Sequence, residues 1–131
     1  MRRSFIALVL SAVAVSGLAW SHEGHNAEHG ADGKEITVKG ELIDMACYMA
    51  HEGKGKKHAD CAKMCVLDGA PLGILTAEGA VYLLVEDHSS AKSKKPYNQA
   101  RKLVAENVTI KGDVHQRGGV QAIVVESVTK D

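Results

Sequence analysis

The chain has 131 residues, with 16 basic and 16 acidic side chains, so its formal net charge is zero. This balance excludes the strongly basic surface that nucleic-acid-binding domains present. Aromatic residues make up only 4% of the chain, which is too few for a platform that stacks bases.

The first 21 residues have the pattern of a secretory signal. Arg2 and Arg3 precede the apolar stretch FIALVLSAVAV, and small residues then fit cleavage after Ala19 or Ser21. The stretch is too short for a spanning helix and lacks its flanks, so we expect no membrane insertion after cleavage. The sequence therefore predicts a periplasmic or secreted protein, in a compartment where disulfides persist.

Residues 22–34 form a polar leader that contains histidine and glycine and has no apolar periodicity, so we expect it to be flexible. Cleavage after Ala19 would make His22 the third residue, a position that chelates Cu²⁺ or Ni²⁺ in a square plane. With His25 and His29 nearby, the leader is a second candidate metal site. A solvated leader without metal is the alternative.

The folded domain is expected over residues 35–131. Its first segment, residues 35–44, alternates apolar and polar side chains, the period of a half-buried strand. Gly40 interrupts this alternation, as expected where a strand bends or bulges.

Two helical segments are predicted next. Asp44 can cap a short helical turn that runs through Tyr48, and residues 51–57 are expected to form a mobile loop. Residues 58–69 have the pattern of a helix, with Gly69 in the left-handed position that ends it.

A hairpin is expected from two short strands, residues 72–76 and 80–87, across Glu78-Gly79. The apolar face predicted for the second of these strands consists of Val81, Leu83 and Val85. Residues 95–107 then predict a second helix with a narrow apolar stripe. That stripe consists of Ala100, Leu103 and Val104.

The last two predicted strands cover residues 108–115 and 120–128, and the glycines between them favour a tight turn. The order strand, helix, strand, strand, helix, strand, strand is typical of a mainly β fold, the five-stranded Greek-key barrel called the OB fold. The cysteine-bearing helices would be an insertion between strands 1 and 2. An open α+β sheet is the competing arrangement.

Residues 44–65 contain all three cysteines and two of the seven histidines. Cys61 and Cys65 are four residues apart and so share a helix face, and Cys47 can approach from the end of the first strand. Three thiolates completed by His58 or His51 would suit zinc, and thiolates also suit Cu⁺. The main prediction is therefore a protein that binds copper or zinc.

Two other readings of the cysteines stay open. A disulfide from Cys47 to Cys61 or Cys65 would stabilise the fold by about 3 kcal/mol and would indicate a non-enzymatic binding module, with another periplasmic protein as one partner. A redox-active thiol is the third reading, because Cys61 lies in the first turn of its helix, near two lysines. No phosphate loop, catalytic triad or haem-attachment motif marks an enzyme.

Three methionines accompany the cysteines, and they are either weak copper ligands or core residues. These methionines are Met45, Met49 and Met64.

The run GELIDMACYMAH…HADCAKMCVLDGAPLGILT, followed by VYLLV, resembles a family of small secreted bacterial proteins. The shared pattern is a first strand that ends in Asp and Cys, a histidine, Cys-x-x-x-Cys, a glycine and an apolar hairpin. The resemblance covers about residues 36–128 and implies an OB-like domain. The candidate site that it implies consists of Asp44, Cys47, His58, Cys61 and Cys65.

Overall fold

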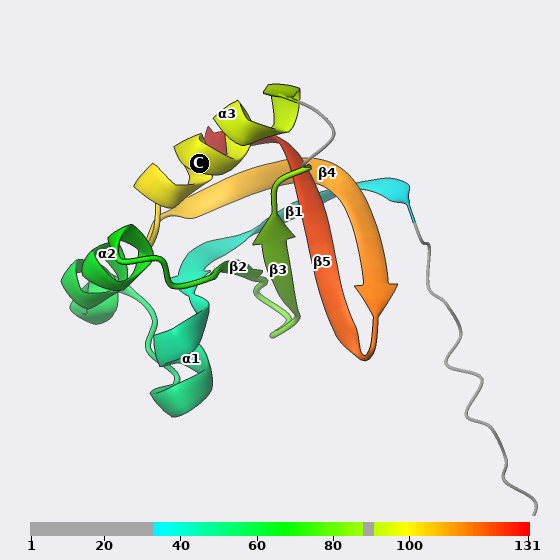
Figure 1. Cartoon of the computed structure of the whole chain (residues 1–131). Helices are drawn as coiled ribbons and strands as arrows, with labels where there is room; N and C mark the ends of the chain where they lie inside the picture. Colours follow the sequence, from blue (N-terminus) through cyan, green and yellow to red (C-terminus); the bar gives the residue numbers. More distant parts are fainter. Residues whose placement is uncertain (1–32, 88–90) are drawn as a thin grey trace, which may run out of the picture.

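A computed structural model of the chain describes residues 33–87 and 91–131 (Figure 1). The predicted signal segment and histidine leader therefore lie outside the described residues. The elements are β1 (Lys34–Asp44), α1 (Met45–His51), the 3₁₀ helix η1 (Lys56–His58), α2 (Ala59–Leu67), β2 (Leu72–Leu75), β3 (Val81–Val85), α3 (Ala91–Lys102), β4 (Asn107–Arg117) and β5 (Val120–Lys130).

The five strands close into one barrel in the order β1-β2-β3-β5-β4, with β4 pairing back to β1. All neighbouring strands are antiparallel except β3 and β5, which run parallel. The prediction of a mainly β, five-stranded OB-like barrel is confirmed, and the open sheet is wrong, because β1 is long enough to pair on both sides.

The double pairing of β1 depends on a glycine. The strand pairs with β4 from Lys34 to Glu41 and with β2 from Glu41 onward. Gly40 precedes this change of partner, and a Cβ atom there would lie 2.2 Å from the carbonyl oxygen of Leu75. Only glycine allows the backbones to approach this closely, which gives the predicted break in the alternation its physical reason.

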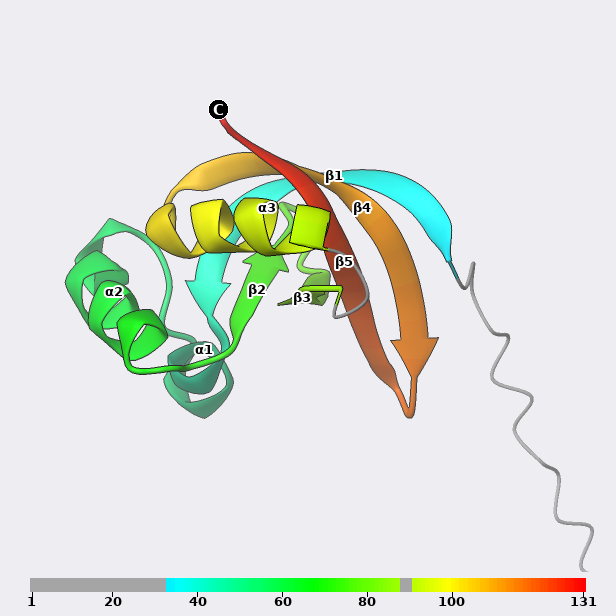
Figure 2. The ribbon, with the colours of Figure 1, turned by 45° about the horizontal axis from the view of Figure 1, so that its top comes forward.

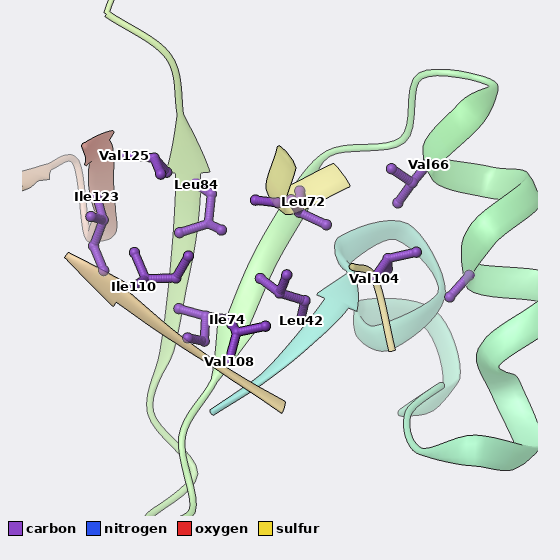
Figure 3. Packing of buried hydrophobic residues seen from close by; sticks show 12 residues of the cluster. Leu42, Val66, Leu72, Ile74, Leu84, Val104, Val108, Ile110, Ile123 and Val125 are labelled. Carbon is purple, nitrogen blue, oxygen red and sulfur yellow. The ribbon is translucent and has the colours of Figure 1, made fainter. Parts of the chain in front are cut away.

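The barrel interior is filled by aliphatic side chains from all five strands (Figure 3). Alternate residues of β4 are buried, as its sequence predicts. The turn from β4 to β5 consists of Gly118 and Gly119, which both have positive φ. The buried aliphatic residues of the strands include Leu42, Leu72, Ile74, Leu84, Val108, Ile110, Ile123 and Val125.

Helices cover one side of the barrel. In Figure 2, α3 lies across the strands, and α1 and α2 lie beyond the end of β1, away from the β4–β5 turn. Ala100 of α3, and Val104 just after that helix, pack into the core. Ala62 and Val66 of α2 pack into it as well. The cysteine-bearing helices are therefore an insertion docked on the barrel through few apolar contacts.

Three local expectations are corrected. The face of β3 that packs against the core contains Tyr82 and Leu84. The predicted apolar face, with Val81, Leu83 and Val85, is the opposite one. Every residue of VYLLV is apolar or aromatic, so the alternation alone did not identify the inner face.

The second helix begins and ends earlier than residues 95–107 suggested. It spans Ala91–Lys102, with Pro96 inside it. It ends because the chain must turn to enter β4: Ala105 has a φ of 68° and donates a hydrogen bond to the carbonyl of Leu42 at 2.7 Å.

The loop predicted over residues 51–57 is shorter, because His51 belongs to α1 and Lys56 begins η1. The backbone N–H of Gly55 donates to the Glu41 carboxylate on β1, and Gly53 is buried against the ring of His58. These contacts hold the loop between α1 and η1 against the barrel.

Candidate metal centre

Cys47 is positioned by the junction of β1 and α1. Asp44, the last residue of β1, caps α1 as predicted, because its carboxylate accepts a hydrogen bond from the N–H of Ala46 at 2.9 Å. The Asp44 side chain is fully buried. Cys47 lies in the first turn of this short helix, half-buried at the edge of the barrel.

Cys61 and Cys65 lie one turn apart on α2, as their spacing predicts. The helix ends with hydrogen bonds from Gly69 and Ala70 back to the last turn, and Gly69 has a φ of 104°. The Arg101 guanidinium of α3 donates to the carbonyl of Val66 near the same end. The burial of Ala62 and Val66 leaves both cysteines half-buried beside α1.

The three sulfur atoms gather at one place. The Sγ of Cys47 lies 3.8 Å from that of Cys65 and 4.0 Å from that of Cys61, and all three thiols are free. Two thiolates bound at about 2.3 Å to one tetrahedral zinc ion lie about 3.8 Å apart, and a trigonal site gives about 4.0 Å. A disulfide would require about 2.05 Å. The spacing therefore fits three ligands of one ion.

Asp44 sets the electrostatics of this cluster. Burial by itself raises the pKa of its carboxyl, but hydrogen bonds from Cys47 and from backbone N–H groups outweigh burial and lower that pKa below its usual value. The same carboxylate, together with burial and the neighbouring thiols, raises the pKa of Cys47 well above the ordinary thiol value. The hydrogen bond with Cys47 acts to lower the pKa of Cys65, but burial together with Cys61 and Asp44 outweighs it and raises that pKa above the ordinary thiol value.

The two histidines form a second group with Cys47. Ligand atoms of Cys47, His51 and His58 all lie within 4.8 Å of one another, and so do the three sulfurs. Within the described residues, neither histidine joins the three thiols in one group of four. The two candidates for the fourth ligand, His51 and His58, thus lie near Cys47 but not near all three thiols.

His58 carries an unsatisfied buried atom. It lies at the end of η1, where it precedes α2, and its Nε2 is buried without a hydrogen-bond partner within the described residues. A Cβ atom at Gly53 would come within 2.6 Å of that Nε2. A buried polar nitrogen without a partner calls for an explanation, and a bound ion is one.

The position of His51 in α1 was missed by the sequence reasoning, which assigned it to a loop. The helix continues to His51, so Cys47 and His51 are four residues apart on one face, the same spacing as Cys61 and Cys65. This Cys-x-x-x-His spacing was visible in the sequence once the helix was extended by one turn.

Other predicted ligands have different outcomes. The leader histidines His22, His25 and His29 lie outside the described residues. Met49 and Met64 are not core residues, because their exposed fractions are 73% and 62%. The Met45 side chain lies against Gly73 of β2.

Within residues 33–87 and 91–131, no helix is long and apolar enough to cross a membrane. Comparisons of this chain with known protein families, with curated proteins and with solved structures give no match.

Proposed function

We propose that this protein is an exported metal-binding protein that holds a soft metal ion, Cu⁺ or Zn²⁺, at Cys47, Cys61 and Cys65. The observation that carries the proposal is the separation of the sulfurs, 3.8 and 4.0 Å about Cys47. Export is supported by the signal-like pattern of the first 21 residues.

The donor set favours soft ions over hard ones. Thiolate sulfur binds Cu⁺ and Zn²⁺ well, whereas Mg²⁺ and Ca²⁺ prefer oxygen ligands. Metal binding displaces the protons of the thiols, so the raised pKa values of Cys47 and Cys65 do not prevent it. They make it dependent on pH.

The coordination number supports a carrier rather than a structural site. Structural zinc sites have four protein ligands, whereas sites that exchange a ligand have three and an open position. The sulfur group has three members within the described residues. Because the cluster is only half-buried, a partner or a small ligand can reach the open position.

A disulfide between Cys47 and one cysteine of α2 is the competing state. It would need the sulfurs to approach by about 1.8 Å or more. In an oxidising compartment this state would compete with metal binding. An experiment on metal content must therefore count free thiols in the same sample.

The test is metal content and affinity of the reduced protein, measured by elemental mass spectrometry and by competition with a chromophoric chelator. Cys61→Ser should weaken Cu⁺ or Zn²⁺ binding at least 100-fold. Met64→Ala is the matched control, because Met64 lies on the same helix with its side chain exposed, and it should leave the affinity unchanged.

Unchanged affinity in Cys61→Ser would contradict the proposal. A purified protein that holds no metal and has a Cys47 bridge would instead favour the disulfide-stapled binding module. Competition between Cu⁺ and Zn²⁺ in the same assay identifies the preferred ion.

A further inference from the structure

We propose that Cys47 is a bridging ligand and that a second divalent ion binds at Cys47, His51 and His58, next to the ion held by the three thiols. This inference rests on the proposed function and deepens it from a site for one ion to a two-zinc centre.

Geometry argues against one ion for all five side chains. Two ligands of the same zinc ion, at about 2.0–2.3 Å each, can lie no more than about 4.6 Å apart. The sulfurs form one group within 4.8 Å and the histidines form another, and no described group contains four of these residues. Cys47 belongs to both groups. A thiolate sulfur has lone pairs enough to bind two ions, so Cys47 can serve both.

The histidine group has features of a site by itself. The buried Nε2 of His58 has no partner within the described residues, and His51 lies one helical turn from Cys47. The two imidazole rings approach edge to face, with centroids 5.5 Å apart at 74°. In this arrangement one nitrogen from each ring can turn toward a common ion with little movement.

The absence of a side chain at Gly53 supports the same conclusion. A Cβ atom there would lie 2.6 to 2.9 Å from three atoms of the His58 ring. The loop therefore packs the backbone of Gly53 closely against the imidazole of His58, which restricts the orientation of that ring. Such packing of a ligand by its surroundings is common at metal sites.

Charge favours two divalent ions over one. Three thiolates and the buried carboxylate of Asp44 carry four negative charges once metal has displaced the thiol protons. One Zn²⁺ would leave two of these charges uncompensated in a half-buried place, which is costly. Two Zn²⁺ ions balance all four, and the imidazoles, which are neutral ligands, add no charge.

The experiment counts Zn²⁺ by native mass spectrometry in the reduced protein. The background carries His22, His25 and His29 replaced by alanine, so that the leader binds no metal. We expect two equivalents in this background, one in His51→Gln/His58→Gln, and one weakly held equivalent in Cys61→Ser/Cys65→Ser. Cys47→Ser should lose both. His115→Gln on β4 is the control and should keep two.

Cobalt distinguishes a bridge from two separate sites. The first Co²⁺ should give thiolate-to-metal absorption, and the second should couple to it magnetically through Cys47, so that the electron paramagnetic resonance signal per cobalt falls. Circular dichroism of each variant verifies that the barrel is folded.

The failures of the two proposals are distinguishable. If the background holds one equivalent, and the double histidine variant keeps it, the second site is wrong and the three-thiol site stands. If Cys47→Ser retains an ion at the histidines, the bridge is wrong. If neither the background nor any variant binds Zn²⁺ or Cu⁺, both proposals fail.

Discussion

The barrel and its helical insertion differ in how they are held together. The strands pack a continuous aliphatic core whose members are almost all completely buried. The insertion, residues 45–71, contributes only Ala62 and Val66 to that core, and neither α1 nor η1 contains a buried residue.

The insertion instead gathers polar groups. Its thiols and imidazoles meet beside Asp44, and two buried polar atoms, Asp44 Oδ2 and His58 Nε2, have no partner within the described residues. Such groups destabilise a fold unless something satisfies them. The comparison shows that burial stabilises the barrel, whereas the proposed ion would satisfy polar groups of the insertion.

The largest effect is expected from a substitution that destabilises the barrel. Gly40→Ala places a Cβ atom against the Leu75 carbonyl, and we expect it to lower the free energy of unfolding by about 3 kcal/mol or more. Gly79→Ala is the control, since its φ is 87° but its Cβ meets nothing within 4 Å. Gly79→Ala should lower the free energy of unfolding by only about 1 to 2 kcal/mol, because alanine is strained at this φ. Equal losses in urea denaturation would show that the close contact relaxes freely.

Metal removal should act on the insertion. At a free Zn²⁺ concentration 100 times the dissociation constant, we expect binding to stabilise the folded protein by about 2.7 kcal/mol. Hydrogen exchange should show the protection concentrated in α1 and α2, with β4 and β5 little changed. Uniform protection over the whole chain would contradict the division between barrel and insertion.

The pH dependence of the metal-free, reduced protein should depend on Cys47. The Asp44 carboxylate and burial raise its folded-state pKa above the usual thiol value of about 9, so the stability that this thiol contributes is fully present below about pH 9 and is lost as the pH rises further. The midpoint temperature of thermal unfolding should therefore fall more steeply between pH 8 and 10.5 in the wild type than in Cys47→Ala. Parallel curves would show that the neighbouring carboxylate does not act on this thiol.

The smallest effect is expected at the exposed surface of the insertion. Met64→Ala removes a side chain that is 62% exposed, and we expect the free energy of unfolding to change by no more than about 0.5 kcal/mol. Metal affinity should also stay the same. A loss of Cu⁺ affinity in this variant would show that the thioether takes part in binding.

The local patterns of the sequence were enough for the element order. The alternation in β1, β4 and β5, the cap at Asp44 and the helix end at Gly69 are all short-range signals, because each depends on the geometry of a few adjacent residues. They also predicted that Cys61 and Cys65 share a helix face, and they favoured a five-stranded barrel over the open sheet, whereas closure itself depends on pairing between distant strands.

Only the tertiary structure decided which histidines meet which thiols. Cys47 comes from α1 while Cys61 and Cys65 come from α2, and the loop between these helices fixes His58 through its packing on Gly53. The inner face of β3 and the end of α3 at Lys102 also depended on distant partners. These features arise from contacts between segments far apart in the chain, and the period of a single segment carries no information about them.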